Sequence, residues 1–94
     1  MGVEYQAVIV VGLPTDEVEF DMDFAEDNGL DIIGRYYDAG WDDSIVGIAI
    51  ATTDSYSWTE LKTLELPGDI VKATAEFRSA TGLVPRVFLS TWGW

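Results

Sequence analysis

The chain has 94 residues, of which 48% are hydrophobic and twelve are aromatic, and its formal net charge is −12. This length supports one hydrophobic core, so we expect a single compact domain over residues 1–94. Cysteine and histidine are both absent, which excludes disulfide frameworks, zinc sites built on thiolates or imidazoles, and Ser-His-Asp hydrolases. The longest apolar runs, at 7–11 and 45–51, are far shorter than the roughly 20 residues that span a membrane. We therefore expect a cytoplasmic protein that does not bind membranes, located in the host cytosol if it is encoded by a phage.

The negative charge is concentrated in one part of the chain. Residues 1–54 contain thirteen acidic residues and one basic residue, Arg35, whereas residues 55–94 contain four of each. A small domain stays soluble with a net charge of about 2–8 in magnitude, so solubility does not require this segregation. The asymmetry indicates that the first part of the chain meets a basic partner.

The predicted elements begin with two strands. Residues 4–12 are nearly all apolar and rich in β-branched side chains, which is typical of a strand buried on both faces. Residues 18–24 (VEFDMDF) alternate apolar and acidic side chains without interruption, and this period of two predicts a second strand. Three carboxylates would then line its outer face: Glu19, Asp21 and Asp23.

A helix from Thr15 to Asn28 is the alternative for this region. Thr15 is a suitable N-cap, and acidic residues are favourable in the first turn of a helix. With the strand interpretation, residues 25–29 form a turn that ends in Asn-Gly and closes a hairpin.

Two further strands are predicted at residues 31–37 and 44–52. The loop between them, residues 38–43, is rich in aspartate and glycine, which favour turns. Each strand contains one glycine that predicts a bulge or a close approach of another backbone: Gly34 and Gly47.

The pattern becomes helical after residue 53. Ser57 and Glu60 have the spacing of a capping box, which predicts a short helix that ends before residue 67. A longer helix is predicted over residues 68–81, with Gly82 at its C-terminal end. Its apolar stripe consists of Ile70, Ala73, Thr74, Phe77 and Ala80.

The order of elements predicts an α+β domain. With a last strand at residues 85–90, the chain has a mainly antiparallel sheet of about five strands with two helices on one face, in the order ββββααβ. If residues 15–28 are helical instead, the order is βαββαβ, the ferredoxin-like arrangement, which is the alternative.

Acidic and aromatic residues form the predicted partner-binding site. Alternate side chains on one face of a strand lie about 6.6 Å apart, a coarse match to the phosphates along a nucleic-acid backbone. Tyrosine and tryptophan are common anchors in protein interfaces. An ordinary solvated strand face is the alternative interpretation. The predicted site consists of Glu17, Glu19, Asp21, Asp23, Glu26, Asp27, Asp31, Tyr37, Asp38, Trp41, Asp42 and Asp43.

The sequence predicts no catalytic residue, no metal ligand and no cofactor. It has no Gly-rich phosphate loop, and the residues after Asp21 and Asp23 depart from the EF-hand pattern. Asp38, Asp42 and Asp43 are the residues from which a weak divalent-ion site would be built, so a carboxylate-based metal-binding module is kept as an alternative.

These observations lead to one functional hypothesis. We expect a small non-enzymatic inhibitor that mimics nucleic acid and occupies the basic nucleic-acid channel of a larger protein, such as a nuclease complex, without binding nucleic acid itself. Charge and size resemble, by analogy only, those of anti-CRISPR, anti-restriction and nuclease-immunity proteins. A housekeeping domain of a salt-adapted organism is a further alternative, although such a domain would carry acidic residues on every face.

Overall fold

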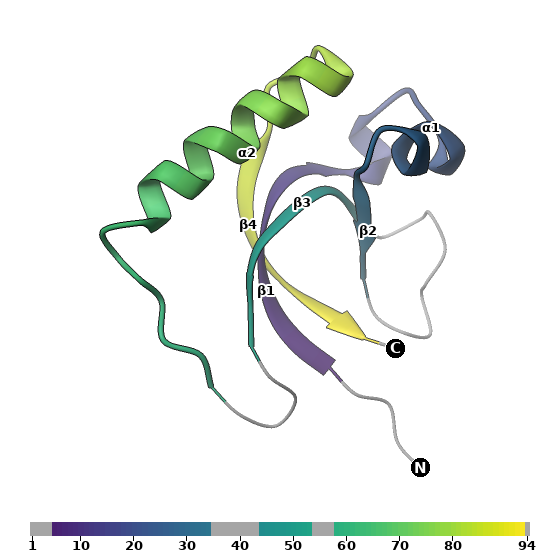
Figure 1. Cartoon of the computed structure of the whole chain (residues 1–94). Coiled ribbons are helices and arrows are strands. Elements are labelled where there is room, and N and C mark those ends of the chain that lie inside the picture. Colours follow the sequence, from purple (N-terminus) through teal and green to yellow (C-terminus); the bar gives the residue numbers. More distant parts are fainter. Residues whose placement is uncertain (1–4, 35–43, 54–57, 94) are drawn as a thin grey trace.

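The computed structural model describes residues 5–34, 44–53 and 58–93. In chain order, the elements are β1 (Tyr5–Pro14), the 3₁₀ helix η1 (Thr15–Glu17), α1 (Met22–Asp27), β2 (Asp31–Ile33), β3 (Ile45–Thr52), α2 (Leu66–Thr81) and β4 (Arg86–Gly93). The described strands form one antiparallel sheet in the order β2-β3-β1-β4 (Figure 1). The α+β class and the antiparallel sheet are therefore confirmed, with four described strands instead of about five. Among the described residues, no helix is both long and apolar enough to cross a membrane.

The strand predicted at residues 18–24 is wrong, because this segment is a bend followed by α1. Asp21 begins the helix: its carboxylate Oδ1 accepts a hydrogen bond from the backbone N–H of Phe24 at 3.0 Å. The hairpin predicted across residues 25–29 is wrong as well. Gly29 has the expected positive φ, +73°, but it lies directly after α1 and allows the chain to leave the helix. The observed order is thus βαββαβ, with the predicted helix divided into η1 and α1 and capped by Asp21 instead of Thr15.

The alternating pattern of this segment has a packing explanation. Val18 and Phe20 come from the bend and pack against the core, whereas Ala25 is the buried residue of α1. Phe24 is on the exposed side of the helix, where its ring lies 4.8 Å from that of Phe20. The regular period of two therefore combines side chains from two different local structures and does not come from one strand.

β1 is one of the two inner strands of the sheet and is buried on both faces, as predicted. Val8 and Val10 are fully buried and pack with Ile33 of β2 on one face. On the other face, Leu13 belongs to a cluster with Phe77 of α2. The predicted strands at 44–52 and 85–90 correspond to β3 and β4, and the one at 31–37 is present as β2, with residues 35–37 outside the described residues.

α2 covers part of one sheet face, and its stripe is confirmed. Ala73 and Phe77 are buried, while the other three predicted stripe residues are half-buried. The helix ends at Gly82, which has a φ of +74°. The short helix predicted from Ser57 is wrong within the described residues: positions 58–62 have no regular structure and a turn follows. Trp58 and Leu64 are 79% and 97% exposed, so tertiary burial of these side chains does not stabilise a helix there.

The backbones of β1 and β3 come very close at Gly12 and Gly47, which lie opposite each other. A Cβ atom on either glycine would lie 2.7 Å from the Cα of the other and closer still to a carbonyl oxygen. Only glycine fits at both positions, which confirms the close approach predicted at Gly47. Figure 1 shows β1 and β3 curving together toward α1.

Replacement of either glycine is expected to destabilise the fold. Gly12→Ala or Gly47→Ala should lower the free energy of unfolding by about 1–3 kcal/mol or more, because the methyl group overlaps backbone atoms of the neighbouring strand. Gly68→Ala is the control, since a Cβ there meets no atom within 4 Å. Lying in α2, the control should be neutral or stabilising by up to about 1 kcal/mol. Denaturant unfolding measures all three variants, and an equal effect at the three sites would contradict the close approach.

Candidate functional site

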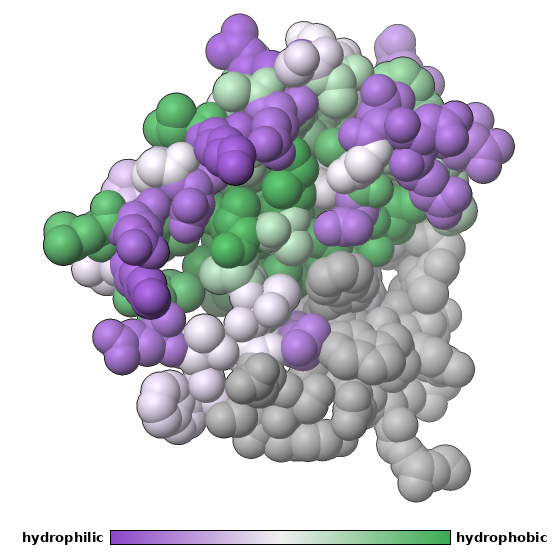
Figure 2. Space-filling view, in the orientation of Figure 1, coloured by the Kyte–Doolittle hydropathy of each residue, from purple (hydrophilic) through white to green (hydrophobic). Residues whose placement is uncertain are grey.

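Eight acidic residues lie between positions 16 and 31, and all of them are exposed. They occupy η1, the bend that follows it, α1 and the first residue of β2, and we call this region the acidic lobe. Figure 2 shows hydrophilic residues gathered over the position of α1. The lobe consists of Asp16, Glu17, Glu19, Asp21, Asp23, Glu26, Asp27 and Asp31.

The carboxylates of the acidic lobe do not form the predicted row. Glu19 lies in the bend, Asp21 caps α1 and Asp23 lies in its first turn, so these three share no strand face. A different group arises in α1, where Asp23, Glu26 and Asp27 are three and four residues apart. Residues with this spacing are neighbours on a helix surface, with Cβ atoms about 5–6 Å apart. The helix thus groups three exposed carboxylates on one turn.

One member of the lobe is paired with a base. The Arg86 guanidinium donates to the Glu17 carboxylate at 2.6 Å, and both side chains are about half exposed. Arg86 also lies over the ring of Phe88, 5.2 Å from its centroid. This is the only ion pair within residues 5–34, 44–53 and 58–93, so the other acids of the lobe have no described basic partner.

Asp31 differs electrostatically from its neighbours. It is the first residue of β2 and lies opposite Gly47 of β3. Although Asp31 is exposed as a residue, the protein around its carboxyl displaces part of the water, and this desolvation raises the pKa of the carboxyl above its ordinary value of 3.8.

The structure brings together seven of the twelve predicted site residues, those from Glu17 to Asp31. Sequence reasoning left out Asp16, which is exposed in the same lobe. No three acidic side chains in the described part of the chain lie close enough to hold a metal ion. The remaining predicted residues lie outside the described residues: Tyr37, Asp38, Trp41, Asp42 and Asp43.

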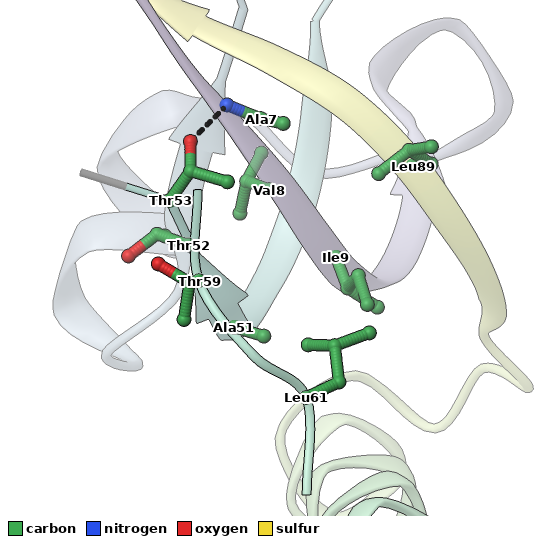
Figure 3. Close-up of a pocket in the computed structure, with 9 residues that line it drawn as sticks. All are labelled: Ala7, Val8, Ile9, Ala51, Thr52, Thr53, Thr59, Leu61 and Leu89. Carbon is green, nitrogen blue, oxygen red and sulfur yellow. Dashed lines mark hydrogen bonds between the residues drawn. The ribbon is translucent and has the colours of Figure 1, made fainter. Parts of the chain in front are cut away.

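A second surface was not predicted from the sequence. On β4, Leu89 is 78% exposed and Val87 is 49% exposed, on the sheet face that α2 covers only in part. Beside Leu89 lies a pocket of about 110 Å³, in which Leu61 and Ile9 point toward one another (Figure 3). This volume is well below the roughly 300–1,000 Å³ of small-molecule sites. Residues 87–89 are apolar at every position, so the sequence did not indicate which of them would be exposed.

Comparisons with known protein families, curated proteins and solved structures find no match to this chain. Its function must therefore be inferred from the acidic lobe and the other described surfaces.

The role of Asp21 as a helix cap leads to a prediction. Asp21→Ala should lower the free energy of unfolding by about 0.5–2 kcal/mol, because the N–H of Phe24 loses its acceptor. Asp21→Asn removes the same charge but keeps a capping oxygen, so it should cost much less. Thermal unfolding followed by circular dichroism distinguishes the two variants. Equal losses would show that the charge of Asp21, and not its cap, stabilises α1.

The raised pKa of Asp31 predicts a pH dependence of stability. The folded state binds a proton more tightly than the unfolded state, so this group favours folding at low pH, and the contribution is lost as the pH rises from about 4 through the folded-state pKa. Asp31→Asn should therefore reduce the fall in melting temperature above pH 4 and raise the melting temperature at pH 7. Asp27→Asn, which removes the same charge from exposed α1, is the matched control. An identical pH profile for the two variants would refute the effect of burial.

Proposed function

We propose that the protein is a small non-enzymatic inhibitor or binding protein that uses its acidic lobe to occupy the basic nucleic-acid-binding surface of a larger protein. The observation that supports this function is the segregation of charge. The lobe carries eight exposed carboxylates, and the described part of the chain provides one base in contact with them, Arg86. Anti-CRISPR, anti-restriction and nuclease-immunity proteins are the functional classes to which such an inhibitor would belong, by analogy of charge and size.

The proposed docking depends on charge density and not on a matched phosphate spacing. Carboxylates on one turn of α1 lie within about one Debye length, roughly 8 Å at physiological ionic strength, so they act as a group on an approaching cation. Unpaired surface charge of one sign steers the approach of an oppositely charged partner and sets its orientation. The same negative field repels nucleic acid, so the proposed partner is a basic protein.

The proposal includes neither catalysis nor a cofactor. The order of elements and strands supports a ferredoxin-like arrangement, a fold that hosts many unrelated functions. We further propose that Tyr37 and Trp41 act as interface anchors and that the protein works in the cytoplasm, which is the host cytosol for a phage-encoded protein.

Charge reversal within the lobe tests the proposed function. The immobilised protein is exposed at low salt to a nuclease-treated cell lysate, and bound proteins are released first with duplex DNA and then with a salt step. We expect nucleic-acid-binding proteins in the DNA eluate. Glu26→Lys with Asp27→Lys should reduce this capture by roughly tenfold or more, since like charges then meet at the interface. Basic residues suit the last turn of α1, so the fold should persist.

A matched variant tests whether capture depends on the position of the acidic residues or only on the net charge of the protein. Glu60→Lys with Glu76→Lys exchanges two exposed acids outside the lobe and gives the same net charge of −8. This control should keep the capture. If both double variants lose it equally, or if DNA releases nothing from the wild-type protein, the proposed function is wrong.

A further inference from the structure

The outer side of β3 changes character along its length. β2 pairs only with Ile45–Gly47, and from Ile48 to Thr52 no described strand pairs with this side of β3. Burial follows the same division, because Val46 and Gly47 are buried whereas every residue from Ile48 to Thr52 is half-buried. In an antiparallel strand, alternate residues turn their N–H and C=O groups to each side. About 13 Å of β3 therefore forms an open edge.

The open edge borders a groove between β3 and α2. Two hollows of about 240 Å³ each form this groove, and both are lined by Ile50 and Asp69, so they adjoin. Ile48 and Ala73 line the hollow nearer the core, and Ala51 and residues 59–62 line the other. Figure 2 shows hydrophobic surface between the hydrophilic residues over α2 and those over α1. The groove thus has an apolar floor along an open strand edge.

A bulge in β3 explains why Ile50 lies in both hollows. Val10 pairs with Ala49 and Ile9 pairs with Ala51, so Ile50 is an extra residue with no counterpart on β1. A bulge leaves the extra residue outside the regular ladder and redirects its side chain. Of the β3 residues, Ile50 is accordingly the one that lines both hollows. It lies at the middle of the floor.

Acidic side chains outnumber basic ones around the groove. Within residues 5–34, 44–53 and 58–93 none of them forms an ion pair, since the pair described above joins Glu17 and Arg86. The net charge of −12 repels phosphate groups and a second copy of this chain, and it attracts cations. The groove therefore suits lysine or arginine side chains. Its charged lining residues are Glu60, Lys62, Glu65, Asp69, Lys72 and Glu76.

We propose that the groove binds an extended, lysine- or arginine-rich segment of another protein, which adds to β3 as a short antiparallel strand. Its backbone pairs with the open edge between Ile48 and Thr52, in the mode called strand addition. The aliphatic stems of alternate basic side chains lie over Ile50, and their charged groups reach Asp69 and Glu76. The site is separate from the acidic lobe, so this proposal does not rest on the function proposed above.

A synthetic peptide tests the site directly. The peptide alternates lysine and threonine over about seven residues, enough to pass the open edge, and carries a fluorescent label. Fluorescence anisotropy should show saturable binding with a Kd of roughly 10–500 µM, weakened by added salt. The same peptide with glutamate in place of lysine should not bind. Absence of saturable binding up to roughly 1 mM lysine peptide, or equal binding of the glutamate peptide, would overturn the proposal.

Methylation of the peptide backbone tests strand addition. In a strand, the N–H groups of alternate residues point to the same side. Methyl groups on every threonine nitrogen therefore block one side of the peptide, and methyl groups on every lysine nitrogen block the other. One of these two peptides should bind roughly tenfold or more weakly than the other, because only one side pairs with β3. Equal affinity of the two would overturn strand addition, since binding through side-chain charge alone does not distinguish them.

Two charge variants separate this groove from the acidic lobe. Glu60→Lys with Glu76→Lys places two bases at the groove and should weaken binding of the lysine peptide by roughly tenfold or more. Glu26→Lys with Asp27→Lys has the same net charge but changes α1, so it should keep the affinity for the peptide. The capture of proteins that DNA releases should respond in the opposite way, so each proposal can fail without the other. Equal weakening of peptide binding in the two variants would overturn the groove, because net charge alone would then explain it.

Discussion

The close contact between the backbones of β1 and β3 at Gly12 and Gly47 sets the geometry of the domain. Two side chains are missing where the strands meet, so the strands can approach closely and curve together. Immediately beyond this contact, Leu13 pairs with Val46, and both belong to the core cluster that contains Phe77 of α2. The next residues end β1 and begin η1. The position of the acidic lobe therefore depends on a contact that contains no charged residue.

The fold carries two surfaces of opposite character, the acidic lobe and the exposed apolar residues of β4. Most of the acidic lobe lies beside β2, whereas the exposed apolar residues of β4 lie at the other edge. The sheet is curled enough for β2 and β4 to contact each other, and Phe88 of β4 packs against the cluster that contains Ile33 of β2. The pair of Glu17 and Arg86 is a further contact between the lobe and β4, and it neutralises the charge of Arg86 at the start of that strand.

The parts of the fold that could be predicted are those in which the hydrophobic pattern of a segment arises from a single strand or helix. The run at residues 7–11 is apolar because both faces of β1 are covered, and the stripe of α2 follows from one helix lying on one surface. The pattern of residues 18–24 predicted a strand wrongly because Val18 and Phe20 pack against a core cluster whose members, among them Val46 and Phe77, are distant in the sequence. The capping box at Ser57 and Glu60 likewise precedes a segment in which Leu64 is almost fully exposed, so tertiary packing does not stabilise the predicted helix. A short stretch of sequence does not show which distant residues its side chains will contact, so such errors cannot be avoided from the local pattern alone.

The candidate site was predictable in its composition but not in its geometry. The sequence alone locates the acids between Asp16 and Asp31, because charge can be counted without a fold. The spacing of their carboxylates depends on whether the segment is strand or helix, and the cap at Asp21 decides this. The apolar surface at Leu89 could not be predicted, since exposure there requires β4 to be an edge strand, and strand order is a property of the whole sheet.

The central place of β1 has a consequence for synthesis on the ribosome. Of the described strands β1 is made first, and it pairs with β3 and with β4, the last of them. Val8 and Val10 therefore leave the ribosome long before Ser90 and Phe88, the residues opposite them on β4. Until then a strongly apolar segment lacks one of its two neighbours, which is the condition under which nascent chains associate wrongly or recruit chaperones. The charge that follows β1 in the acidic lobe keeps incomplete chains apart during this interval.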